Sequence, residues 1–164
     1  MSNPEPRSRT RKTLLLGLGN DILSDDSIGL RVASALQERL APDPNLTIQQ
    51  TTEIGLALLD LVQGYEHLVL IDAVQTSECP TGTVHHVRDT DLPNIPALSP
   101  HFLGIGETLA LGRKLALPVP ETVEIFAIEV DDPFTVSTEL TPELQSQLPR
   151  IVDQILMHCR AGYL

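Results

Sequence analysis

Cysteine, aromatic residues and long apolar runs are all scarce in this chain, and each scarcity excludes a class of protein. The two cysteines, Cys79 and Cys159, lie far apart and outside any Cys-x-x-Cys arrangement. They predict neither a disulfide framework nor a thiolate metal site, and they favour a reducing cytoplasm as the compartment. No apolar run reaches the roughly 20 residues of a membrane-spanning helix, so we expect no membrane span.

Aromatic and basic residues are too few for a nucleic-acid-binding protein. Aromatic residues make up 3% of the composition and tryptophan is absent, which counts against a platform for base stacking. The chain has 11 Lys and Arg against 22 Asp and Glu, and its formal charge is −11. Because phosphate binding needs clustered cations, we expect no nucleic-acid partner. An acidic protein suits a metal ion or a basic segment of another protein.

The start of the chain differs in charge from the rest. Its cations are Arg7, Arg9, Arg11 and Lys12. A basic segment without an apolar stretch makes neither a signal peptide nor a membrane anchor. We therefore expect residues 1–12 to be a flexible basic tail and residues 13–160 to form a single α/β domain. Nothing in the pattern indicates a coiled coil, so we expect a monomer.

Residues 13–31, TLLLGLGNDILSDDSIGLR, contain the most informative pattern. Thr13–Leu18 is almost entirely apolar, as in a strand that is buried on both faces. A helix follows, with Ile28, Val32, Leu36 and Leu40 at helical spacing, and Ser24 or Asp25 can cap it. The loop between strand and helix contains three acids, which are Asp21, Asp25 and Asp26. Ligands of open parallel sheets bind outside the carboxyl ends of the strands, so this loop is a candidate binding site.

The remaining pattern predicts four more strands and three more helices. We expect strands at 46–51, 67–73, 82–88 and 122–128, and helices within 52–64, after Ser99 and after Thr141. Residues 82–88 follow the preceding strand too closely for a crossover helix, so we expect an antiparallel hairpin with residues 67–73. The order βαβαββαβα predicts an α/β protein, a three-layer α/β/α sandwich whose mostly parallel five-stranded sheet has one antiparallel strand.

Three side chains converge at the carboxyl edge of this predicted sheet. Asp26 falls on the first turn of the first helix, Asp72 at the end of a buried strand, and His101 on the first turn of the third helix. A helix N-terminus favours an ionised carboxylate and a neutral imidazole. Two carboxylates and one imidazole suit a divalent ion of the zinc or nickel type and leave one coordination position open. The plainer alternatives are a helix cap, a carboxylate bonded to loop amides and a surface histidine.

The other histidines are expected to be structural. His85 and His86 are adjacent, so on a strand they face opposite ways and cannot both ligate one ion. We give His67 and His158 structural roles as well. No serine or cysteine has the surroundings of a nucleophile, because Gly-x-Ser-x-Gly is absent and neither cysteine is followed by a suitable base.

Four separated motifs, GLGNDILSDDSIGLRV, LVLIDAV, GTV and LSPHFLG, occur in this order. They resemble the signatures of the hydrogenase maturation endopeptidases, and the similarity runs from about Thr13 to the final helix. The resemblance implies a three-layer α/β/α fold and a peptidase that removes the C-terminal extension of a nickel-iron hydrogenase large-subunit precursor after nickel insertion. It implies that Asp26, Asp72 and His101 contact the metal. The expected metal is nickel carried by the precursor, and zinc or cadmium could take its place.

The chain departs from the family pattern at two positions. Many members have Glu where this chain has Asp26, and the shorter side chain should move the ion toward the helix end or admit a water molecule. Thr51–Gly55 reads TTEIG where many relatives have an Asp-Gly-Gly-Thr turn associated with substrate recognition, so this departure bears on partner specificity. The proton-transfer group has two candidates, since either Asp21 or Asp25 could orient an attacking water or take its proton.

Two other functions remain to be weighed. Gly17-Leu18-Gly19 after a buried strand is compatible with a nucleotide-binding module. However, Ile22 stands where a dinucleotide fingerprint needs glycine, and no Gly-Lys-Ser/Thr sequence occurs. The second alternative is a non-catalytic metal-binding chaperone or scaffold for hydrogenase assembly that uses the same two acids and histidine.

Overall fold

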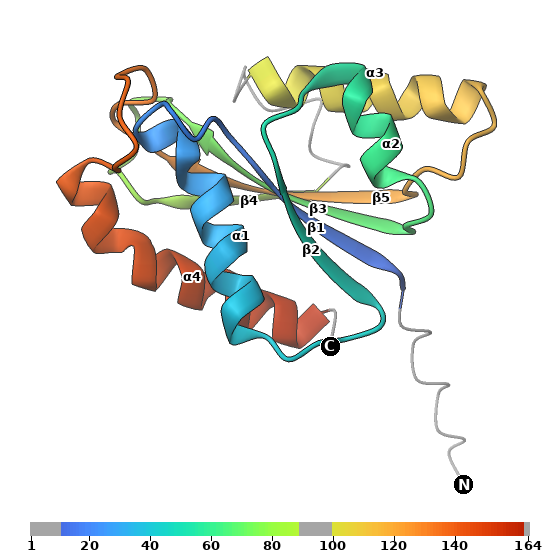
Figure 1. Cartoon of the computed structure of the whole chain (residues 1–164), viewed down its shortest axis with the longest axis horizontal. Coiled ribbons are helices and arrows are strands. Elements are labelled where there is room, and N and C mark those ends of the chain that lie inside the picture. Colours follow the sequence, from blue (N-terminus) through green and yellow to red (C-terminus); the bar gives the residue numbers. More distant parts are fainter. Residues whose placement is uncertain (1–10, 89–99, 163–164) are drawn as a thin grey trace, which may run out of the picture.

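The computed structural model describes residues 11–88 and 100–162, which form one sheet between two layers of helices (Figure 1). The strands within these residues are β1 (Thr13–Leu18), β2 (Leu46–Thr51), β3 (His67–Val74), β4 (Val84–Arg88) and β5 (Thr122–Glu129). They form a sheet in the order β2-β1-β3-β5-β4, in which only the β4 pairing is antiparallel. The predicted fold class is therefore confirmed.

The partner of the antiparallel strand differs from the prediction. β4 pairs with β5, with Val84 opposite Ile128 and Arg88 opposite Glu124, so the expected hairpin with β3 is wrong. β5 lies between them and pairs in parallel with β3 from His67 to Val74. Burial explains this difference. Every residue of β3 is buried, which is typical of a central strand, whereas β4 has half-buried and exposed residues, which is typical of an edge strand.

Helices cover both faces of the sheet. One face carries α1 (Ile28–Arg39) and α4 (Pro142–Gly162), and the other carries α2 (Leu58–Val62) and α3 (Pro100–Lys114) (Figure 1). Two short 3-10 turns, η1 (Asp25–Ser27) and η2 (Gly55–Ala57), lead into α1 and α2. The predicted helix positions are confirmed. Ser99, the expected cap of α3, lies outside the described residues, as does most of the expected basic tail.

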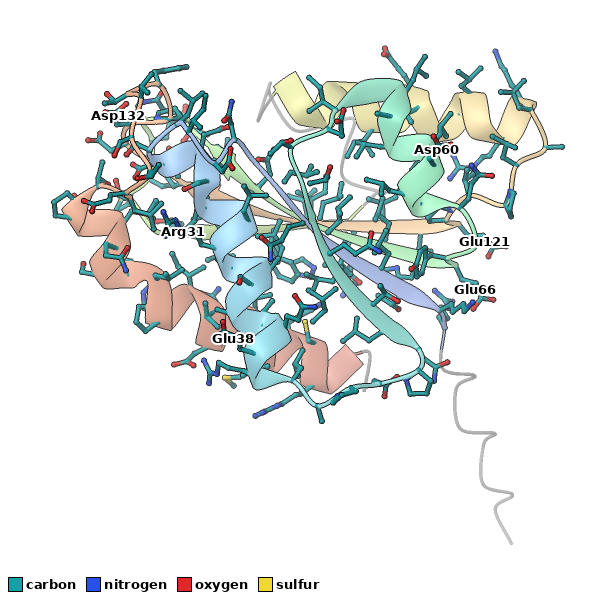
Figure 2. The ribbon with its side chains drawn as sticks, viewed as in Figure 1. Arg31, Glu38, Asp60, Glu66, Glu121 and Asp132 are labelled. Atoms are coloured by element: carbon teal, nitrogen blue, oxygen red, sulfur yellow. The ribbon has the colours of Figure 1, made fainter. Side chains whose placement is uncertain are left out.

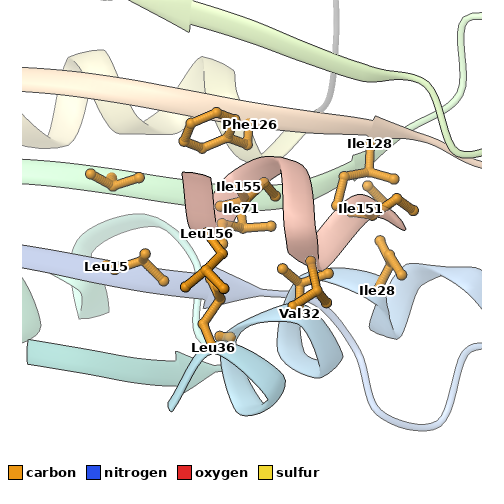
Figure 3. Close-up of a cluster of buried hydrophobic side chains, with 14 of the residues drawn as sticks. Leu15, Ile28, Val32, Leu36, Ile71, Phe126, Ile128, Ile151, Ile155 and Leu156 are labelled. Atoms are coloured by element: carbon orange, nitrogen blue, oxygen red, sulfur yellow. The ribbon is translucent and has the colours of Figure 1, made fainter. Parts of the chain in front are cut away.

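Alternation along the strands divides the apolar side chains into two cores. Leu15, Ile71 and Phe126 face α1 and α4, where they pack with the apolar sides of those helices (Figure 3). Leu16 and Leu70 face the other way, toward α2 and α3. Because successive strand residues point to opposite faces, the same alternation assigns every polar strand residue to one face.

The first turn of α1 packs very closely on the sheet. A Cβ atom on Gly29 would lie 2.2 Å from the carbonyl oxygen of Leu18 and 2.3 Å from that of Ile71. A Cβ on Gly17 would lie 2.3 Å from the carbonyl oxygen of Gly29. Only glycine permits this approach, which draws the start of α1 against the carboxyl ends of β1 and β3.

Both cysteines are free thiols. Burial, together with the negative charge of Glu124, raises the pKa of Cys159 from 9.0 to about 12, so this thiol stays protonated. None of the helices within residues 11–88 and 100–162 combines the length and the apolar character that crossing a membrane requires.

Candidate functional site

The predicted metal-contacting residues lie on segments at the carboxyl end of the parallel strands. Asp72 in β3 is fully buried, and its Oδ1 accepts a hydrogen bond of 2.8 Å from the backbone N–H of Ala73. Asp26 is half-buried in η1, a turn that contacts β3. His101 belongs to the first turn of α3, at the same end of the sheet (Figure 1), and its side chain lies outside the described residues. The structure thus brings the two acid-bearing segments together and gives only the backbone position of the histidine.

Close backbone packing fixes the position of Asp26. A Cβ on Gly19 would lie 2.2 Å from the carbonyl oxygen of Asp26, so the chain leaving β1 passes directly beside η1. The glycines of Gly17-Leu18-Gly19 therefore serve contacts between the strand and the following helix. This packing accounts for both glycines without a bound phosphate, and it removes the feature that favoured a nucleotide-binding module.

Asp25 connects η1 to the loop between β5 and α4. Its side chain is fully buried, and Oδ1 accepts a hydrogen bond of 2.8 Å from the backbone N–H of Thr141. Oδ2 accepts hydrogen bonds of 3.0 Å from the N–H of Asp132 and from the hydroxyl of Thr141. The predicted helix cap by Ser24 or Asp25 is wrong, because neither side chain caps η1 or α1. The Ser24 hydroxyl instead donates a hydrogen bond of 2.9 Å to the backbone carbonyl oxygen of Glu139 in the same loop.

Asp21 is exposed and lines a cavity of about 570 Å³ between α1 and the end of β2. Thr51, Thr52 and Glu53 line the opposite side, so the cavity includes part of the segment where the chain departs from the family pattern. Arg31 of α1, labelled in Figure 2, also lines the cavity and donates hydrogen bonds to the Ser27 hydroxyl and to the backbone carbonyl of Thr138. The cavity offers both acidic and basic groups to a ligand.

Sequence reasoning missed Glu129, a buried carboxylate at the end of β5. It is 1% exposed and accepts hydrogen bonds from the N–H and hydroxyl of Thr76, at 2.7 and 2.8 Å, and from the N–H of Ser77, at 2.9 Å. The Nε2 atom of His85 lies 3.3 Å from it. Burial by itself raises the pKa of Glu129, but these hydrogen bonds outweigh burial and lower it. The only sequence signal is an acid that ends an apolar strand.

Comparison with known families connects this geometry to an activity. The family model for hydrogenase maturation protease, HycI, matches residues 30–158. The chain belongs to this family. The matched range contains Asp72 and His101, and Asp26 precedes it. Membership makes the chain a hydrolase of the peptidase class that acts in hydrogenase maturation, as the four motifs predict.

Individual relatives agree with the family assignment. The hydrogenase 2 maturation protease of Escherichia coli (strain K12) is 26% identical over 151 residues, which cover 91% of this chain and 91% of that protein. The hydrogenase expression/formation protein HoxM of Azotobacter vinelandii is 29% identical over 153 residues, which cover 86% of this chain and 72% of that protein. The structure of the hydrogenase maturating endopeptidase HybD from E. coli superimposes with a TM-score of 0.77 at 26% identity, over 92% and 93% of the two chains.

Proposed function

We propose that this protein cleaves the C-terminal extension from the large-subunit precursor of a nickel-iron hydrogenase, in the cytoplasm, once nickel has been inserted. Family membership supplies the reaction class. The proposed position of the site is supported by the contact of η1 with β3, which holds the segments of Asp26 and Asp72 at one edge of the sheet. Ligands of open α/β sheets bind at that edge.

In this proposal, nickel is part of the substrate, and Asp26, Asp72 and His101 contact it. Two carboxylate oxygens and one imidazole nitrogen are donors that a divalent ion of this class accepts, and zinc or cadmium can replace it. A divalent ion next to the scissile bond supplies a polarised carbonyl and an acidified water. The hydrogen bond from Ala73 orients the carboxylate of Asp72, so the metal and the bond to be cut take a defined position.

Of the two acids considered for proton transfer, Asp21 is the better candidate. It is exposed and lines the cavity beside α1, so a water molecule can reach its carboxylate. Asp25 is fully buried and accepts hydrogen bonds from two residues of the loop after β5. With both oxygens engaged by these donors and no exposure to solvent, Asp25 is not positioned to contact a water molecule at the surface.

The loops at the carboxyl edge have the composition of a protein-docking surface. They expose apolar side chains that follow β1, β2 and β5, namely Ile22, Ile54, Leu56, Phe134 and Val136. These side chains are 56% to 77% exposed, and each belongs to a loop or turn that follows the carboxyl end of a parallel strand. Exposed apolar side chains around a site favour a macromolecular substrate over a small polar one.

The decisive experiment uses a purified, nickel-loaded hydrogenase large-subunit precursor. We expect the protein to shorten the precursor by its C-terminal extension, as measured by mass spectrometry, and to leave the nickel-free precursor intact. A precursor that binds the protein but stays at full length would instead identify a non-catalytic scaffold.

Two substitutions test the metal-contacting residues in the same assay. His101→Ala and Asp72→Asn should each lower the cleavage rate at least a hundredfold, about 3 kcal/mol of lost transition-state stabilisation. Asp60→Asn, an exposed acid on α2, is the matched control and should cleave at the unchanged rate. Cleavage by His101→Ala at the rate of the unmodified protein would refute the assigned role of the histidine.

A further inference from the structure

A second group of metal-ligand side chains lies on the face of the sheet that α1 and α4 cover. His86 of β4, Glu124 of β5 and His158 of α4 meet there. The Nε2 atoms of His86 and His158 lie 2.7 and 3.0 Å from the same carboxylate oxygen of Glu124. One ligand atom from each of the three residues lies within 4.8 Å of the others.

This group is separate from the proposed peptidase site. Glu124 pairs with Val69, which lies three residues before Asp72 on β3. Glu124 is therefore about 10 Å from Asp72 along the strand direction, toward the amino ends of the parallel strands. Alternation also puts Glu124 on the face of Phe126, toward α1 and α4, whereas Asp72 shares the opposite face with Leu70. One ion cannot bridge the two groups.

Neighbouring side chains hold the three ligands in place. The ring of His86 stacks on Phe126 with centroids 4.7 Å apart, and His158 meets the same ring edge-on at 5.1 Å. The other carboxylate oxygen of Glu124 lies 3.6 Å from Nε2 of the buried His67. Metal sites depend on this kind of support, because ligands that are already oriented lose less freedom on binding.

We propose that His86, Glu124 and His158 bind a divalent ion of the zinc class. Two imidazole nitrogens and one carboxylate oxygen are a common zinc donor set, and they leave a fourth position for water. Ligand atoms around tetrahedral zinc are about 3.4 Å apart, given bonds of about 2.0–2.1 Å, so small rotations of the two imidazoles suffice. Their side chains are each 30% exposed, so the ion has access from solvent.

The ion would connect the edge strand β4 to β5 and to the C-terminal helix α4. Since the ligands come from three elements distant in sequence, the unfolded chain lacks the site, and binding should raise the melting temperature. The competing account is a cluster held by hydrogen bonds alone, in which Glu124 accepts from both imidazoles and no metal binds.

A zinc titration of the tag-free, full-length chain distinguishes the two accounts. We expect calorimetry to count one fewer Zn²⁺ in His86→Asn/His158→Asn than in the unmodified chain, or an apparent affinity weakened at least about tenfold. His85→Asn is the matched control, because this neighbouring histidine faces the opposite side and contacts Glu129. It should keep the full stoichiometry and the zinc-induced rise in melting temperature.

A second measurement needs no substitution. In the unmodified chain labelled with ¹⁵N-histidine, Zn²⁺ should shift the Nε2 resonances of His86 and His158 together, at one equivalent, and leave that of His85 unchanged. Unshifted resonances, or a double variant that matches the unmodified chain in both zinc stoichiometry and zinc affinity, would overturn the metal site. Precursor cleavage enters neither readout, so this result is independent of the proposed peptidase function.

Discussion

Buried carboxylates near the carboxyl edge differ in their hydrogen-bond partners. Asp25 holds a loop through the donors of Asp132 and Thr141. Glu129 holds the segment after β3 through Thr76 and Ser77. Asp72 takes its orientation from the adjacent backbone, at the end of a fully buried strand. Asp25 and Glu129 each join two segments of the chain, whereas we propose that Asp72 contacts the metal of the substrate.

Asp25→Ala tests the joining role. Removing this carboxylate leaves the donors of Asp132 and Thr141 without their acceptor, so we expect the free energy of unfolding to fall by about 2–5 kcal/mol. Urea denaturation measures the change. The exposed Asp21 supplies the comparison: Asp21→Ala should alter stability by less than about 0.5 kcal/mol. Equal stability of the two variants would contradict the assignment.

Glu129 predicts a specific dependence of stability on pH. Because its pKa is lowered in the folded state, it stabilises the protein above the ordinary value of 4.5, and this contribution disappears as the pH falls through the lowered pKa. Glu129→Gln should cost about 1–3 kcal/mol at neutral pH. The difference from the unmodified protein should narrow below about pH 4.5. Urea titrations at several pH values test this; a difference independent of pH would argue against it.

Single residues were predictable from sequence only where local pattern decided their position. Asp72 ends an apolar run, and that run alone places it at a strand end. The partners of Asp25 lie 107 and 116 residues away, so no local pattern reveals them. The group formed by His86, Glu124 and His158 was missed for the same reason. The opposite orientation of His85 and His86 was predicted correctly, since alternation along a strand is local.

At the scale of elements, the contact of α1 with the sheet sets the geometry of the proposed site. Gly29→Ala would put a Cβ within 2.3 Å of two backbone oxygens, so α1 and η1 must move away from β3. We expect a loss of about 3 kcal/mol or more of stability, together with slower precursor cleavage. Gly106→Ala, on the exposed side of α3 with no atom within 4 Å, should be stabilising by about 0.5–1 kcal/mol. Thermal denaturation of both variants compares them directly.

The element order was predictable, and one pairing was not. Helix periodicity and buried runs indicate the strands and helices, because both are local properties. Whether β4 pairs with β3 or with β5 depends on the neighbours of β3. Because β3 is apolar along its whole length, it favours a central position with a parallel strand on each side, and β4 then pairs with β5. A short connection between β3 and β4 does not decide that competition.

At the scale of the whole molecule, the acidic surface should affect encounter with the precursor. Glu38, Asp60, Glu66 and Glu121 are exposed on several sides of the molecule (Figure 2). If this charge of −11 attracts a basic C-terminal extension, the association rate should fall about threefold to tenfold between 20 and 150 mM salt. Stopped-flow mixing measures this rate, and a rate that does not vary with salt would exclude steering.

The position of β5 between β3 and β4 has a consequence for biosynthesis. The ribosome translates residues 84–88 before residues 122–129, which β4 needs for its backbone hydrogen bonds. Until then residues 84–88 lack the strand with which they pair, and an unpaired strand is prone to associate with other chains. The sheet therefore cannot form in the order of translation, because β5, the last strand to be translated, is inserted between β3 and β4.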